Sequence, residues 1–188
     1  MAAFHPPDIF PGYNVPMNIS TDYRYSGLRR SLHWLSALVI IWALISGTCL
    51  AFFPLTADVQ QWLGRFNVAL ALLFIPFFLL RSVLAVLQPK PATTALTVRQ
   101  QRLAATGHWL IYVVVLAVLF SGVFMLERPA PVFGLTELMP PLRAGAATAF
   151  FAALHHYSCA LLALLVLGHI AAVIVHQRRG VRLLQKML

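Results

Sequence analysis

The stretch AFFAALHHYSCALLALLVLGHIAAVIV, residues 149–175, decides how the rest of the chain is interpreted. It is long enough to cross a bilayer as a helix, because a span needs about 20 predominantly apolar residues. It carries His155, His156 and His169 within that length. At about 100° per residue, His155 and His169 return to nearly one face, roughly 40° apart, and stand about 21 Å apart along the axis. Ionisable side chains at membrane depth are costly, so these histidines indicate functional sites at two depths.

Three further apolar runs precede this one, at residues 32–53, 63–87 and 107–126. The chain has 188 residues, of which 60% are hydrophobic, and more apolar surface than a soluble domain of this size can bury. The sequence therefore predicts an all-α fold, an integral membrane four-helix bundle over residues 28–177. An N-terminal arm (residues 1–27) precedes it and a basic tail (residues 178–188) follows it.

The net charge of +9 is distributed as in a membrane protein. If the N-terminus is inside, three of the 14 lysines and arginines lie on the outer side, namely Arg65, Arg128 and Arg143, which leaves eleven on the inner side. This is the positive-inside bias, and it predicts that both termini are cytoplasmic. It also argues against binding to nucleic acid, for which the basic residues would be expected on one continuous face.

Local signals refine the picture at four places. Ser31 is a candidate N-cap of the first span, and Pro76 should kink the second. The inner loop, residues 88–106, is expected to carry a short interfacial helix. The outer loop, residues 127–150, is rich in proline and apolar residues and suggests a lid packed on the outer mouth.

The histidines are the set of residues that can carry chemistry, since no zinc-ligand spacing and no phosphate-binding glycine loop is present. On the inner side these are His33, His108 and His169. Two histidines from different helices can bind a haem iron axially, with the porphyrin between the helices. Such a six-coordinate iron suits electron transfer. The alternative is that the histidines only form hydrogen bonds between helices. Arg81, near the inner end of the second span, either snorkels to the interface or pairs with an anion.

Several motifs together resemble the bacterial cytochrome b561 family of four-helix membrane haem proteins. They are SLHWLSA at the start of the first span, Arg81, GHWLIY at the start of the third span, FGL at residues 133–135, and the spacing of 14 positions from His155 to His169. The resemblance covers about residues 25–176. It implies a multi-pass protein of the bacterial inner membrane that binds two haems b, one toward each side.

The resemblance assigns His33 and His169 as the iron ligands of the inner haem. It assigns the outer haem to His155 and to a second-span histidine 34 positions after His33, where this chain has Asn67. Asparagine is a poor ligand for haem iron, so the outer site stays open between two alternatives. Either His155 or His156 holds an outer haem alone, or that haem is lost.

A small residue that the family often has one turn after the missing histidine is Ala71 here rather than glycine, which would crowd a porphyrin slightly. Arg81 and His108 could neutralise haem propionates, and His176 matches a quinone-side position of the family. All three could instead be interfacial anchors.

The function implied is that of a transmembrane b-type cytochrome, which transfers electrons between a quinone such as ubiquinone and a second redox partner. Some family members oxidise superoxide and reduce ubiquinone, whereas others are the membrane haem subunit of a dehydrogenase. The alternative is an accessory or structural subunit of a larger membrane redox complex, with a partly lost haem site and a partner contacted through residues 1–27. A small transporter is disfavoured because no internal repeat or broken helix is evident.

Overall fold

The computed structural model describes residues 26–88 and 97–181. Within these ranges it contains the elements α1 (Gly27–Phe52), α2 (Ala57–Leu87), α3 (Val98–Phe124), β1 (Ala130–Val132), β2 (Thr136–Leu138) and α4 (Ala146–Arg178). Each of the four helices is long and apolar enough to cross a membrane. The four predicted spans are therefore confirmed, and a short β-hairpin that the sequence did not predict is added to them.

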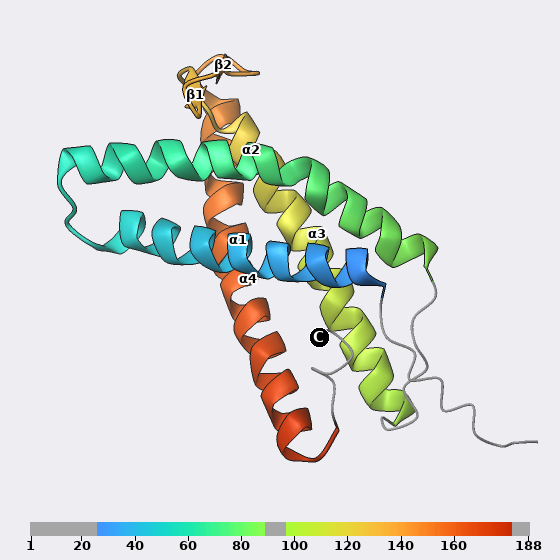
Figure 1. The fold of residues 1–188 in the computed structure, drawn as a ribbon. Helices are drawn as coiled ribbons and strands as arrows, with labels where there is room; N and C mark the ends of the chain where they lie inside the picture. Colours follow the sequence, from blue (N-terminus) through green and yellow to red (C-terminus); the bar gives the residue numbers. More distant parts are fainter. Residues whose placement is uncertain (1–25, 89–96, 182–188) are drawn as a thin grey trace, which may run out of the picture.

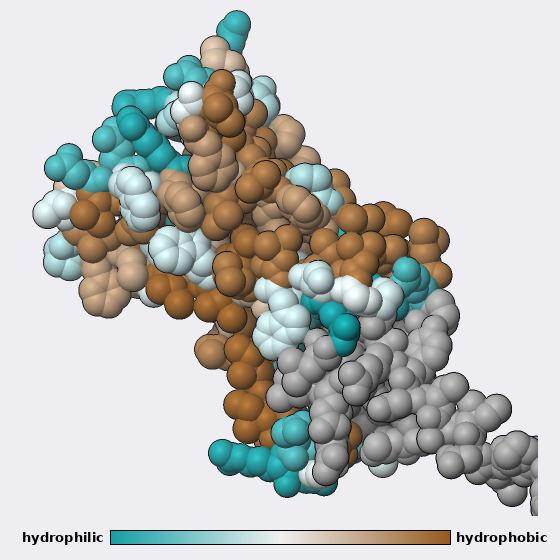
Figure 2. All heavy atoms as spheres, in the orientation of Figure 1, coloured by the Kyte–Doolittle hydropathy of each residue, from teal (hydrophilic) through white to brown (hydrophobic). Residues whose placement is uncertain are grey.

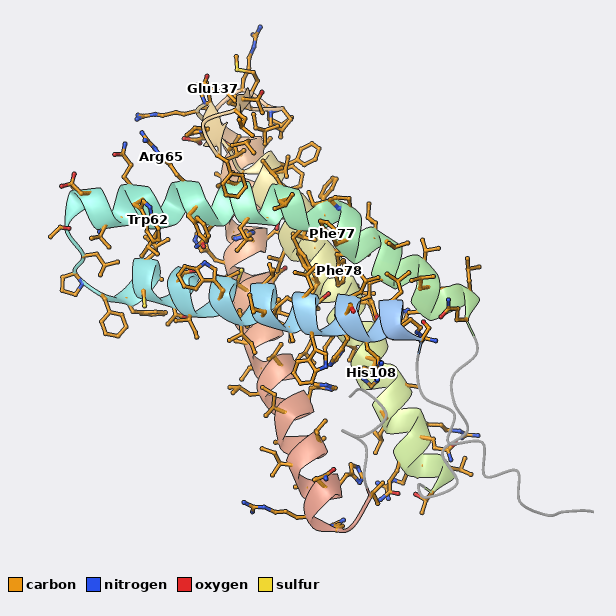
Figure 3. All side chains as sticks on the ribbon, in the orientation of Figure 1. Trp62, Arg65, Phe77, Phe78, His108 and Glu137 are labelled. Carbon is orange, nitrogen blue, oxygen red and sulfur yellow. The ribbon has the colours of Figure 1, made fainter. Side chains whose placement is uncertain are left out.

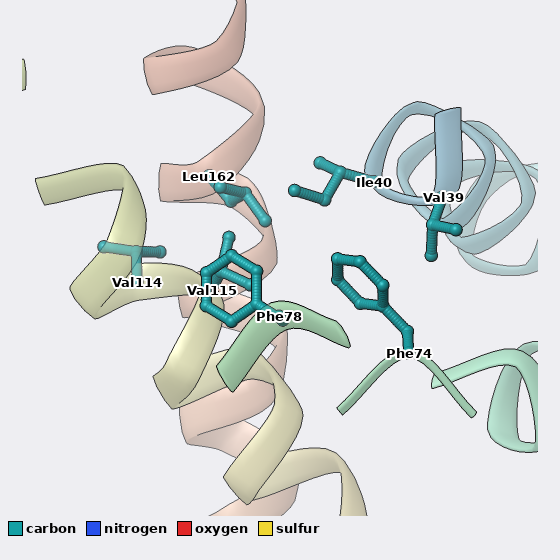
Figure 4. Packing of buried hydrophobic residues seen from close by; sticks show 7 residues of the cluster. All are labelled: Val39, Ile40, Phe74, Phe78, Val114, Val115 and Leu162. Carbon is teal, nitrogen blue, oxygen red and sulfur yellow. The ribbon is translucent and has the colours of Figure 1, made fainter. Parts of the chain in front are cut away.

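The helices form two antiparallel pairs, α1 with α2 and α3 with α4. The two pairs cross at a wide angle instead of lying alongside one another (Figure 1). All four helices contribute to one apolar core, whose buried residues are Val39, Ile40, Phe74, Phe78, Val114, Val115 and Leu162. Phe74 and Phe78 of α2 reach between the other helices, with α1 on one side and α3 on the other (Figure 4).

Most of the apolar surface faces outward. Only 11–22% of the most apolar window of each helix is buried inside the molecule, and side chains such as Leu38 and Leu164 are 69% and 68% exposed. On the visible face, apolar residues cover the middle, and hydrophilic residues gather near the hairpin and near the end of α4 (Figure 2). Helices that are apolar all round are stable in lipid, where each satisfies its own backbone hydrogen bonds.

The first turns of α1 and α3 differ from the sequence-based predictions. Ser26, not Ser31, is the N-cap of α1, and its hydroxyl accepts a hydrogen bond from the Arg29 N–H at 3.4 Å. The expected interfacial helix in residues 88–106 is not a separate element in the described part, because residues 98–106 are the first turns of α3. Thr97 starts that helix with a capping box, which satisfies two backbone groups reciprocally.

Pro76 lies inside α2, and the helix continues through it as one element. Figure 1 shows α2 bending in its second half, as expected where a proline removes one backbone donor.

The outer loop folds into the hairpin of β1 and β2, with Ala130 opposite Leu138 and Val132 opposite Thr136. Its turn uses positive φ angles at Phe133 (50°) and Gly134 (72°). The hairpin packs on α2, and the Phe133 ring meets the Phe66 ring edge-on at 6.3 Å. The hairpin of the loop is therefore packed against α2.

Candidate functional site

All four helices bring polar side chains together near one end of the molecule. His33 comes from α1, Arg81 from α2, His108 and Tyr112 from α3, and His169 from α4. We call these five residues the His33 cluster. All of them are half-buried. The alternating direction of the helices explains the convergence, since the residues lie near the start of α1 and α3 and near the end of α2 and α4.

Arg81 joins three of the helices. Its Nη2 lies 3.1 Å from Nδ1 of His33, and its guanidinium carbon lies 5.2 Å from the centre of the Tyr112 ring. The second contact has the geometry of a cation–π interaction. The acidic residues of the described ranges are Asp58 in the first turn of α2, Glu127 just after α3 and Glu137 in β2, so none lies near the end of α2 that carries Arg81. Arg81 therefore has no carboxylate partner among the described residues.

The two histidines of α3 and α4 in the cluster lie ring against ring. The His108 and His169 rings are 5.1 Å apart and nearly perpendicular. His108 Nδ1 lies 2.7 Å from the Ala104 carbonyl oxygen, which can only accept, so Nδ1 carries the proton. Arg81 contacts both His33 and Tyr112, and Tyr112 lies one turn after His108 on α3, which brings His33 into the neighbourhood of the two facing rings. In Figure 3, His108 is labelled on the first half of α3, below the label of Phe78 on α2.

His155 lies near the start of α4, at the opposite end of the helices from the His33 cluster, and faces α3. Its Nδ1 donates to the Val118 carbonyl at 3.1 Å, and its Nε2 lies 3.5 Å from the Cys159 sulfur on the same helix. The ring rests on Gly122, where an added Cβ would stand only 3.1 Å from its Cε1 atom. The neighbouring His156 is exposed on the outer surface of α4.

Asn67 is occupied by contacts with α1. Its Oδ1 accepts hydrogen bonds from the Trp42 indole nitrogen at 3.2 Å and from the Ser46 hydroxyl at 2.9 Å. Ala71, one turn later, is half-buried. The sequence analysis missed Trp42 and Ser46, although their spacing of four residues places both on one face of α1.

A family model described as prokaryotic cytochrome b561 matches residues 24–188, which include all four helices. The chain belongs to this family. No curated protein matches it. As a cytochrome b561, the chain is a multi-pass membrane protein in contact with lipid, a b-type haem is its expected cofactor, and its function is transmembrane electron transfer.

The two ends of this cytochrome b561 differ in how well their residues suit a haem. The His33 cluster offers imidazoles from α1 and α4 together with a cationic side chain that lacks a carboxylate partner among the described residues. Such a donor set fits a haem b, which needs two axial ligands and cations for its propionates. At the other end, His155 turns one imidazole toward α3, and the side-chain oxygen of Asn67 is hydrogen-bonded to Trp42 and Ser46.

The apolar core separates the two ends of the cytochrome on every helix. On α2, for example, the core residues Phe74 and Phe78 lie between Asn67 and Arg81. Phe78 also packs directly on Tyr112, with ring centres 5.6 Å apart. The His33 cluster is therefore closed on one side by packed aromatic rings.

His176 lies two turns beyond His169, near the end of α4, and is half-buried. Its backbone carbonyl accepts from the N–H groups of Arg179 and Val181 and so helps to end the helix. Tyr112 is the member of the His33 cluster to which the sequence analysis gave no role. It follows His108 by four positions, so the GHWLIY motif already placed the two on one helix face.

Proposed function

We propose that this cytochrome binds one haem b between α1 and α4, and that it passes single electrons between a quinone and a second redox partner. The observation that carries the proposal is the convergence of His33, Arg81, His108 and His169 from four different helices. An arrangement that only stabilised helix contacts would not need, in a membrane span and beside imidazoles, an arginine with no carboxylate partner in the described part of the chain.

Each residue of the cluster has a role in this proposal. His33 and His169 would hold the haem iron, and Arg81 and His108 would pair with its propionates. His176, farther along α4, lies on the quinone side. When bound, the haem supplies a one-electron carrier with no open coordination position. The residues hold it, orient it and exclude water, with Phe78 and Tyr112 closing the site.

We further propose that no second haem is bound at the other end. His155 keeps its Nδ1 on the Val118 carbonyl, and the Asn67 oxygen is used by Trp42 and Ser46. His156 is exposed, which does not suit an axial ligand inside the bundle. Without an outer haem, oxidation of superoxide at the outer surface loses its electron path. This favours an electron-carrying subunit of a larger membrane complex over a free-standing enzyme.

The test is the number of haems per polypeptide in the purified full-length protein, measured as the pyridine haemochrome and as iron. We expect one. His169→Ala and His33→Ala should each lose it, and the matched control His156→Ala should keep it because that side chain is exposed. Two haems per chain would overturn the one-haem proposal, and full haem content in His169→Ala would overturn the ligand assignment.

The orientation and the partner are also proposals. Eleven of the 14 basic residues on one side support cytoplasmic termini. Residues 1–25 and 182–188, which hold most of the arm and tail, lie outside the described residues. We propose that the arm (residues 1–27) contacts another subunit. Deletion of residues 1–24 should leave the haem content unchanged and abolish co-purification of a partner chain, whereas unchanged co-purification would refute the assignment.

A further inference from the structure

The hydrogen bond between Arg81 and His33 fixes where the proton sits on the His33 ring. A guanidinium has only donors and stays protonated in proteins. At 3.1 Å from Arg81 Nη2, Nδ1 of His33 must therefore be the acceptor. In a neutral imidazole the proton is then on Nε2.

This tautomer is the opposite of the one found at His108 and His155. Those two rings donate from Nδ1 to the carbonyls of Ala104 and Val118, which leaves the lone pair of the neutral ring on Nε2. A donor on Nδ1 is the usual second contact of a metal-ligating histidine, since it fixes the ligating nitrogen as the unprotonated one. His33 has neither nitrogen available, because Nδ1 accepts from Arg81 and Nε2 is protonated.

For a neutral ring, the Arg81 hydrogen bond and iron ligation by His33 therefore exclude one another. A carboxylate that binds Arg81 would break its hydrogen bond with His33 and leave His33 Nδ1 without that donor. The guanidinium forms stronger, often bidentate, hydrogen bonds with a carboxylate than with a neutral acceptor. Among the described residues, none of the acidic side chains lies at this end of the helices.

We propose that Arg81 makes iron binding by His33 conditional on a carboxylate carried by the same ligand. The inference rests on the proposed haem site and concerns its selectivity: a porphyrin with free propionates is bound more tightly than one with esterified propionates. Arg81 moves from His33 to the propionate, and the same movement frees His33 to place its proton on Nδ1. Arg81 is thus a positioning residue for an iron ligand as well as a partner of the ligand's acid group.

The experiment uses haem-free full-length protein in detergent micelles, titrated with haemin or with haemin dimethyl ester and followed by Soret absorbance. In the wild type we expect haemin to bind at least about tenfold more tightly than the ester, since one charge-assisted hydrogen bond is worth about that factor. In Arg81→Leu the ester should bind several-fold more tightly than it binds to the wild type, because His33 is no longer held. A simple salt bridge to the propionate predicts instead that the ester binds equally to both.

The matched control is Arg65→Leu, which removes an exposed arginine from the other half of α2 and should change neither affinity. Because Arg81→Leu could fail to fold, the tautomer is measured independently. Long-range proton–nitrogen NMR of the haem-free wild-type protein should show His33 with an unprotonated Nδ1. A protonated Nδ1, or equal ester affinity in the wild type and Arg81→Leu, would refute the Arg81 mechanism. Failure of haemin to bind the wild type at all would instead refute the proposed haem site.

Discussion

Replacing Asn67 by alanine tests whether its hydrogen bonds stabilise the contact between α1 and α2. The change removes one oxygen that accepts from two side chains of α1, Trp42 at 3.2 Å and Ser46 at 2.9 Å. The two lost contacts are not equivalent. Ser46 can still donate to the Trp42 backbone carbonyl at 2.8 Å, so its hydroxyl keeps a partner. The Trp42 indole N–H loses the acceptor that it has in the described structure.

The expected cost follows from these partners. Hydrogen bonds between membrane helices contribute about 0.6 kcal/mol on average, and an unsatisfied donor away from water costs about 1–3 kcal/mol. We expect Asn67→Ala to lower the free energy of unfolding by about 1–3 kcal/mol, most of it from Trp42. In double-mutant cycles, the coupling of Asn67 with Trp42 should therefore exceed its coupling with Ser46, which should stay below about 0.6 kcal/mol.

The assay is unfolding of the full-length protein in mixed micelles titrated with dodecyl sulfate, followed by far-ultraviolet circular dichroism. The single variants Asn67→Ala, Trp42→Phe and Ser46→Ala are combined in pairs. Thr48→Ala is the matched control, because the Thr48 hydroxyl donates only within its own helix, to the Leu44 carbonyl at 2.7 Å. A stability of Asn67→Ala equal to that of Thr48→Ala, or zero coupling with Trp42, would show that Asn67 does not join the two helices.

Three further substitutions test local features. Gly122→Val should displace the His155 ring and cost about 1–3 kcal/mol, whereas Gly168→Val, where an added Cβ meets nothing within 4 Å, should be milder; the same unfolding assay compares them. Gly134→Ala should destabilise the hairpin turn by about 1–2 kcal/mol because φ is +72° there, and faster amide exchange in β1 and β2 would report it. Thr97→Ala should cost about 1 kcal/mol and fray the start of α3, so unchanged amide exchange in that first turn would contradict the capping assignment.

The ends of the helices show which helix boundaries hydropathy predicts and which it misses. The second span was predicted to end at Leu87, which is where α2 ends. The third was predicted to begin at Gly107, but α3 begins at Val98. The missed turns contain Arg99 and Arg102, which are polar enough to lie outside an apolar run and are still good helix formers. Apolar composition locates the part of a helix inside lipid, and it does not locate the polar turns that extend beyond it.

The sequence predicted which residues belong to the candidate site, but not which of them contact one another. His33, His108 and His169 were placed on the same side of the membrane from span order alone, and the structure brings them into one neighbourhood. That Arg81 is hydrogen-bonded to His33 could not be predicted, because it depends on how α1 and α2 are rotated about their axes. The same holds for Asn67: the sequence marks it as a poor ligand for haem iron, but it does not show which two side chains of α1 donate to it.

The sequence by itself determined the number of membrane spans, their order and the end of each span at which the histidines and Arg81 lie. These properties depend on composition along the chain, because an apolar run must be long enough to cross the hydrocarbon core and polar residues end it. The tertiary structure alone decided that the two helix pairs cross, that the outer loop pairs as a hairpin on α2, and which donors meet which acceptors. The physical reason is that these helices are apolar all round, so no periodic pattern specifies which face of each helix packs against its neighbours.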